Sequence, residues 1–287
     1  MTRGVESLRA FAGQGGHDGG HRRRPHVTVV GAGKGGVGTS SLAALVGLQM
    51  ARAGAAVLLV DADETVGTLH MLFGLPAEVP GLGTLRGGGV DPERLLVSVE
   101  PGLALFPGGG GGPEASLALA ASERRLLLRR VAALYDRFDA VVVDGGSRLD
   151  SVMAACAAAS GRVLAVTTKD PIAQAGSYAL AKVAGARFQG LPVELLVNRA
   201  SEAEARKAHE LVAAAAQTFA AMDVPFAGSV AEDPALAEAA GSGASLLGLP
   251  AGTPAAQALA AVAERLVAEA AGAPAAVLPL LPASPAR

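Results

Sequence analysis

The sequence predicts an α/β fold: a doubly wound, mostly parallel sheet of about seven or eight strands, flanked by helices. The chain of 287 residues is 51% hydrophobic and 17% charged, which is enough apolar material for a sizeable core. Short, nearly continuous apolar runs alternate along it with segments of helical length. Such runs are typical of strands buried on both faces, and their alternation with helices predicts βαβ units in one domain.

The predicted strands share a high content of valine and leucine. They are His26–Val30, Ala56–Val60, Leu103–Phe106, Ala140–Val143, Arg162–Thr167, Val193–Val197 and Pro225–Ser229. The predicted helices are Ser40–Ala53, Ser122–Arg137, Leu149–Ala159, Ile172–Phe188, Ser201–Ala221 and Pro254–Ala271. The second helix carries five arginines, for which we expect a solvated face or, alternatively, a surface for a partner or an acidic lipid.

The two ends of the chain differ in composition from residues 26–271, which we predict to be the folded domain. Residues 1–25 read as a flexible basic tail that ends in Arg22-Arg23-Arg24, and residues 272–287 read as a proline-rich tail. The whole chain has a net charge of -2, so we expect no general attraction to nucleic acid.

A glycine-rich loop between the first predicted strand and helix is the sharpest functional signal. Residues 31–41 read GAGKGGVGTSS. Successive glycines let backbone N–H groups converge on phosphate oxygens, and the N-terminus of the following helix adds its dipole. A dinucleotide-binding fingerprint or an unliganded turn are the alternatives. The dinucleotide fingerprint expects a lone acidic residue after the second strand, whereas this chain has a pair, Asp61 and Asp63, which favours a P-loop.

The loop resembles that of the deviant-Walker-A ATPases of the MinD/ParA type, KGGxGK[ST], with Lys34 as the signature lysine. The resemblance extends over roughly residues 26 to 270. It includes VLLVDAD at residues 57–63, VVVDGG at 141–146, where the Walker B strand enters the second switch, and VNR at 197–199, the adenine-side segment. It implies a P-loop NTPase fold that binds ATP or ADP with Mg²⁺.

The resemblance also implies roles for individual residues. It assigns nucleotide binding to Gly33, Lys34, Gly35, Gly36, Val37, Gly38, Thr39, Ser40, Ser41 and Asn198. It assigns magnesium binding to Ser40, Asp61 and Asp144, and catalysis to Lys34 and to Asp63, which would position or deprotonate water. For the three aspartates and for Asn198, a turn at the end of a strand is the alternative role. Lys169 and Asp170 end another strand at the same edge, where loop charges are more often solvated than catalytic.

Thr39 departs from the family pattern, because a complete P-loop has a lysine before the magnesium-binding Ser or Thr. A neutral hydroxyl does not replace a charge that faces a triphosphate. The GGVGTS form is similar to that of the TadZ/CpaE branch, which often lacks this lysine. We expect weak hydrolysis, if any, and a strong dependence of nucleotide affinity on dimerisation, since the family's signature lysine reaches the partner's phosphates.

Within the family, residues 197–205 and 230–236 are most similar to the FlhG branch, MinD-like regulators of flagellar number and placement. Glu6-Ser7-Leu8-Arg9 is a short echo of that branch's motif for the FlhF GTPase. The resemblance implies a switch that forms a homodimer on ATP and acts on a flagellar partner such as FlhF or switch-complex components. The alternative is a non-hydrolysing pseudo-ATPase scaffold of the TadZ/CpaE type that localises a pilus.

Residue counts exclude other relatives. The single Cys156 is too few for an iron-sulfur carrier, and we expect it to be a small buried side chain. A chromosome-partitioning protein needs a basic surface that a near-neutral chain does not indicate, so we expect no specific DNA binding. No amphipathic membrane-targeting helix is evident near the C-terminus. We expect a cytoplasmic protein, recruited through partners to a cell pole or the inner membrane.

Overall fold

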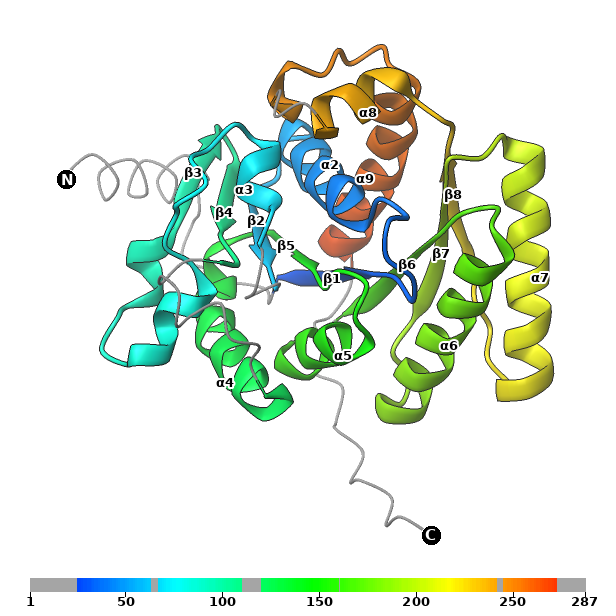
Figure 1. Ribbon diagram of the computed structural model, residues 1–287, viewed down its shortest axis with the longest axis horizontal. Coiled ribbons are helices and arrows are strands. Elements are labelled where there is room, and N and C mark those ends of the chain that lie inside the picture. Colours follow the sequence, from blue (N-terminus) through cyan, green and yellow to red (C-terminus); the bar gives the residue numbers. More distant parts are fainter. Residues whose placement is uncertain (1–24, 63–66, 110–119, 160, 242–244, 273–287) are drawn as a thin grey trace, which may run out of the picture.

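The computed structural model describes residues 25–272 apart from 63–66, 110–119, 160 and 242–244, and shows a central sheet of eight strands with helices on both faces (Figure 1). The α/β fold and the strand number predicted from the sequence are confirmed. The strands are β1 His26–Gly31, β2 Val57–Asp61, β3 Val97–Glu100, β4 Leu103–Phe106, β5 Ala140–Asp144, β6 Arg162–Thr167, β7 Val193–Asn198 and β8 Phe226–Val230. The segments predicted as tails lie outside the described residues, except for Pro25 and Gly272 at their inner ends.

The sheet has the order β3-β4-β2-β5-β1-β6-β7-β8, and all neighbouring strands are parallel except β3 and β4. β1 therefore lies inside the sheet, between β5 and β6. The sequence did not predict β3, a four-residue edge strand of sequence VSVE in which no residue is fully buried. A short antiparallel edge strand lacks the continuous apolar run that revealed the others.

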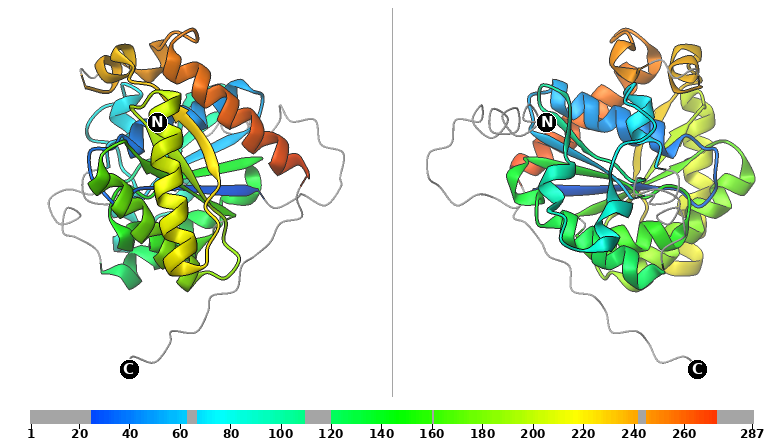
Figure 2. Two further views of the ribbon diagram at one scale, coloured as in Figure 1. Left: turned by 90° about the vertical axis from the view of Figure 1, so that its right-hand side faces the viewer. Right: turned by 60° about the vertical axis from the view of Figure 1, so that its left-hand side comes forward.

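The helices divide between the two faces of the sheet. They are α2 Thr39–Arg52, α3 Leu69–Leu72, α4 Ala121–Ala132, α5 Leu149–Ala158, α6 Pro171–Arg187, α7 Glu202–Ala220, α8 Pro234–Gly241 and α9 Pro254–Gly272. One apolar core joins the sheet to α4, α5, α6 and α7, and the other joins it to α2, α3, α8 and α9. Alternate side chains of a strand enter opposite cores, as Val29 and Val30 of β1 do. α7 covers the β8 end of the sheet, and the left view of Figure 2 shows this helix in front of β8.

The arginines of α4 only partly confirm the solvated face expected from the sequence. Arg124 is fully buried, and its Nη1 donates to Asp150 Oδ2 at 2.9 Å. The guanidinium of Arg130 donates to the backbone carbonyls of Leu85 and Val90 at 2.8 and 2.7 Å. Arg125 and Arg129 are exposed. α4 therefore uses its inward arginines to hold α5 and the segment before β3. The predicted helix was also too long, because α4 ends at residue 132.

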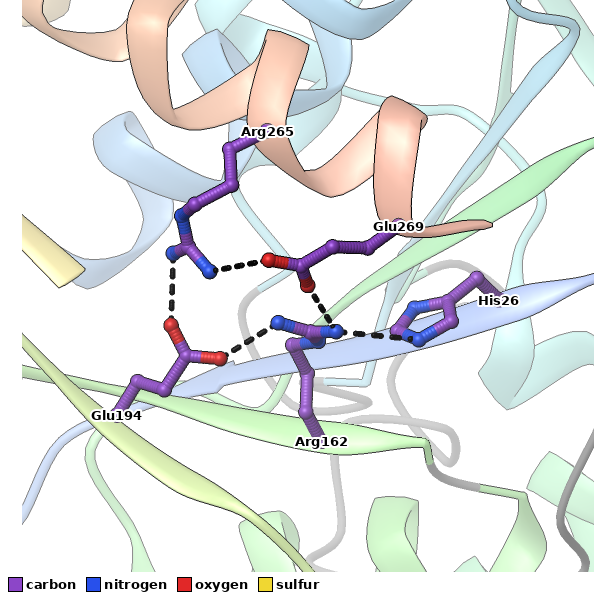
Figure 3. A network of polar contacts seen from close by, with 5 residues as sticks. All are labelled: His26, Arg162, Glu194, Arg265 and Glu269. Atoms are coloured by element: carbon purple, nitrogen blue, oxygen red, sulfur yellow. Dashed lines mark hydrogen bonds and ion pairs between the residues drawn. The ribbon is translucent and has the colours of Figure 1, made fainter. Parts of the chain in front are cut away.

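A network of five side chains closes the amino edge of the sheet against α9 (Figure 3). Arg162 on β6 contacts Glu194 on β7 and Glu269 on α9, each at 2.5 Å. Arg265 on α9 bridges the same two carboxylates, at 2.7 Å to Glu194 and 3.0 Å to Glu269. His26 Nε2 accepts from Arg162 Nη2 at 3.2 Å. Burial, and then the positive charge of Arg162, lowers the pKa of His26, so the neutral ring is favoured. The network fixes α9, which packs along α2 on the same face.

Candidate functional site

The glycine loop lies at the opposite, carboxyl edge of the sheet, between the end of β1 and the start of α2 (Figure 1). Gly36 and Gly38 have φ of 80° and 92°, a conformation that residues with a Cβ rarely adopt. Gly38 is the N-cap of α2, and no side chain caps that end by a hydrogen bond within the described residues. The first N–H groups of a helix have no partner inside the helix, so this end presents donors suited to phosphate.

The loop is packed closely against α6. A Cβ on Gly33 would lie 2.0 Å from the backbone oxygen of Gly176, so no side chain fits there. Beside this contact, the Lys34 ammonium pairs with a carboxylate oxygen of Asp170, the N-cap residue of α6. The Lys34 and Asp170 side chains are 36% and 40% exposed, so the pair lies at the rim of the site.

The hydroxyl residues that follow the loop form the first turn of α2. Thr39 is its first residue and is 7% exposed, whereas Ser40 and Ser41 are partly buried. The position where a complete P-loop has its lysine is therefore a buried threonine. This chain brings a single lysine, Lys34, to the loop.

Two buried carboxylates end the neighbouring strands. Asp61 on β2 and Asp144 on β5 are partners in the strand register and are 1% and 3% exposed. Asp61 Oδ2 accepts from Leu69 N at 3.1 Å, and Asp144 Oδ1 accepts from Gly146 N at 2.9 Å. The carbonyl of Gly146 in turn accepts from Ala32 N at 2.9 Å, which ties this turn to the start of the glycine loop. Asp63 lies outside the described residues.

These donors fit a magnesium nucleotide. Within the described ranges, no three His, Cys, Asp or Glu residues are grouped to hold a metal by themselves. Mg²⁺ in nucleotide sites uses one or two carboxylates together with substrate phosphates and waters. Asp61 and Asp144, with the hydroxyl of Ser40 at the start of α2, supply that kind of oxygen set.

The end of β7 contacts the loop through two side chains. Asn198 is 4% exposed, its Nδ2 donates to Val37 O at 2.8 Å, and its Oδ1 accepts from Arg199 N at 3.0 Å. Arg199 has φ of 55°, and its Nη1 donates to Gly36 O at 3.1 Å. Asn198 thus supports the loop in this structure, and its role toward adenine stays a prediction. The sequence did not predict this contact of Arg199. The signal that could have indicated it is the position of Arg199 directly after Asn198.

Comparison with known proteins decides the family. Residues 26–270 match the family described as cellulose biosynthesis protein BcsQ. The chain belongs to this family. The relatives of this BcsQ-family chain include the flagellum site-determining protein YlxH of Helicobacter pylori, 30% identical over 53% of this chain. They also include an uncharacterized ATP-binding protein of Methanocaldococcus jannaschii, 27% identical over 83% of this chain. The matched segments span 51% of YlxH and 86% of the archaeal protein.

A solved structure shows the same fold. The septum site-determining protein MinD of Pyrococcus horikoshii, complexed with Mg-ADP, has a TM-score of 0.71 and 22% identity to the BcsQ-family chain. The match covers 86% of this chain and 97% of that protein. Family and fold together confirm a MinD/ParA-type P-loop protein. In the described part of the chain, no helix is long and apolar enough to cross a membrane.

Proposed function

We propose that the BcsQ-family chain is an ATP-binding switch that dimerises around a magnesium nucleotide and controls the placement or number of a cell-surface assembly. The observation that carries this proposal is the glycine loop beside the register pair Asp61 and Asp144. These parts come from separate strands and meet at one edge of the sheet. Their chemistry, backbone donors for phosphate and oxygens for a hard cation, is that of a nucleotide site.

Each residue of the site has its own role in this proposal. N–H groups of residues 33–38 and of the first turn of α2, with Thr39 and Ser41, hold the phosphates, and Asn198 holds the adenine side. Ser40, Asp61 and Asp144 hold magnesium, which neutralises phosphate charge when bound. Asp63 positions or deprotonates the attacking water. Lys34 reaches the phosphates of a second copy.

Hydrolysis is weak in this proposal because Thr39 stands where a complete P-loop has a lysine. The catalytic power of a phosphoryl-transfer site comes mainly from positioned charge, so one missing cation lowers turnover more than it lowers binding. A non-hydrolysing scaffold of the TadZ/CpaE type is the alternative, and the same substitution supports it. Retention of the magnesium oxygens favours the switch, since a scaffold that binds no nucleotide has no physical need for them.

The flagellum is our first candidate for the assembly. Relatives include YlxH and the antiactivator FleN of Pseudomonas aeruginosa, which is 26% identical over 55% of this chain. The resemblance to the FlhG branch suggests the FlhF GTPase or switch-complex components as partners. The family description names cellulose biosynthesis, which favours a cellulose-producing complex as a second candidate. Deleting the gene should change flagellar number or position in the first case and cellulose output in the second.

Binding and turnover with ATP and magnesium test the switch directly. We expect slow or absent turnover in the wild type, a clear gain in Thr39→Lys, and loss of the ATP-dependent dimer in Lys34→Ala. Lys182→Ala, which changes an exposed lysine of α6, is the matched control and should behave as the wild type. Oligomer mass is measured in each sample. Wild-type turnover at the rate of a complete family member, unchanged by either substitution, would reject the proposal.

A further inference from the structure

The side chain of Lys34 connects the glycine loop to the start of α6. Lys34 is the charged residue of the glycine loop, and its ammonium contacts Asp170 of the same chain. Asp170 uses its other oxygen, Oδ1, to accept from Ile172 N at 2.8 Å and so caps α6. The carboxylate therefore joins the loop to the first turn of a helix.

The position of Asp170 is set by backbone packing as well as by this ion pair. Gly33 precedes Lys34, and its Cα faces the backbone of Gly176 so closely that a Cβ there would lie 2.0 Å from the Gly176 oxygen. Gly176 belongs to the second turn of the helix that Asp170 caps. The loop backbone and the carboxylate are thus held at a fixed separation by two contacts of the same helix.

A neighbouring ion pair provides a comparison. Lys169 Nζ lies 3.0 Å from Glu204 Oε1, with side chains that are 57% and 45% exposed. Glu204 belongs to the capping box of α7, as Asp170 belongs to the cap of α6. The two pairs are alike in chemistry, the second is the more exposed, and of the two only the first includes a residue of the loop.

We propose that Asp170 is a positioning residue that holds the Lys34 ammonium within its own chain, so that a nucleotide phosphate must compete with this carboxylate for Lys34. The inference rests on the proposed function, because it assigns Lys34 to phosphate. An ammonium has donors and no acceptor, and a carboxylate is the weaker of two anionic partners when a polyphosphate is present. Since Thr39 is neutral, no second lysine of the loop takes over while Lys34 is held.

The charge state of Asp170 agrees with this role. Its contact with Lys34, followed by the hydrogen bond from Ile172 N, lowers the pKa of the carboxyl. The group is therefore ionised throughout the neutral range and pairs with the ammonium there.

Lysine acylation read by mass spectrometry tests the pair without any nucleotide. The chain has four lysines, Lys34, Lys169, Lys182 and Lys207, so each can be followed separately. Asp170→Asn removes the charge but keeps a side chain that caps helices well. We expect it to raise the reactivity of Lys34 severalfold and to leave Lys182 and Lys207 unchanged. Glu204→Gln is the matched control and should raise only Lys169. Unchanged Lys34 reactivity in Asp170→Asn would overturn the inference.

Nucleotide affinity gives the second readout. For an exposed ion pair we expect Asp170→Asn to tighten binding of magnesium ATP by about two- to fivefold. The gain should vanish when Lys34→Ala is also present. Weaker binding by Asp170→Asn would overturn the inference as well, provided that the circular dichroism spectrum of the variant equals that of the wild type. If no variant binds nucleotide, the proposed function and the competition both fail, whereas the acylation result still decides whether Asp170 holds Lys34.

Discussion

The two edges of the central sheet use their buried charges in opposite ways. At the amino edge, Arg162, Arg265 and His26 meet Glu194 and Glu269 in a closed set of side-chain contacts (Figure 3). At the carboxyl edge, the buried carboxylates lie beside a glycine loop and accept hydrogen bonds from backbone N–H groups. The amino edge matches cation to carboxylate within the chain and so serves the fold. The carboxyl edge presents oxygens and N–H groups whose complement is a ligand that carries both phosphate and cation.

Breaking the amino edge should have the largest effect on stability. Glu194→Ala removes the carboxylate that Arg162 and Arg265 share, and Arg162 is 8% exposed. Removal of one partner from a buried ion pair costs about 3–5 kcal/mol, and here two arginines are left with the single carboxylate of Glu269, so one positive charge is uncompensated. We expect a loss of that size in urea unfolding monitored by circular dichroism.

An exposed pair on α7 is the control for this loss. Glu202 and Arg206 are 71% and 61% exposed, and Glu202→Ala should cost no more than about 1 kcal/mol. Equal losses in Glu194→Ala and Glu202→Ala would mean that the amino edge is no more than a surface network.

Breaking the carboxyl edge should act first on the ligand. Gly33→Ala introduces a Cβ 2.0 Å from the Gly176 oxygen, so the loop must move away from α6. We expect nucleotide affinity to fall by tenfold or more, since a displaced donor is no longer aimed at phosphate, with a stability cost of about 1–3 kcal/mol from overpacking. Equilibrium titration with a fluorescent ATP analogue measures the affinity.

Gly252→Ala is the matched control for the loop, because nothing lies within 4 Å of a Cβ there. It should bind nucleotide as the wild type does. If Gly33→Ala also bound normally, the close contact between the loop and α6 would have no role in shaping the site.

The side chain that supports the loop from β7 should have an intermediate effect. Asn198→Ala removes the hydrogen bond to Val37 O, which leaves a buried carbonyl without this partner. The expected cost is about 1–3 kcal/mol of stability, together with weaker nucleotide binding. A calorimetric Tm and the ATP titration separate the two effects. Loss of stability with unchanged affinity for ATP would mean that Asn198 serves the fold alone.

How much the sequence could predict differs between the same two edges. The seven parallel strands and the loop were predictable, because apolar runs and consecutive glycines are local signals. Asp61 and Asp144 were predictable as strand ends, and parallel pairing then puts them side by side. The partners of Arg162 and Glu194 were not predictable, because they depend on which strands become neighbours and on where α9 lies. The pairing of Lys34 with Asp170 was missed for the same reason, since distant loop charges appear solvated in a sequence.

The smallest effect should come from the pH dependence of the amino edge. Burial and Arg162 lower the pKa of His26 in the folded chain, so the unfolded chain binds a proton more readily. The stability due to neutral His26 is therefore present above its ordinary pKa of 6.5 and is lost as pH falls through that value toward the folded pKa. His26→Gln keeps an acceptor for Arg162 but does not titrate. His70 also has a lowered pKa through burial, and because it remains in both proteins, the difference between them isolates His26. We expect the Tm of the wild type to fall more than that of His26→Gln between pH 7.5 and pH 5. Parallel Tm curves would contradict a lowered pKa of His26 in the folded chain.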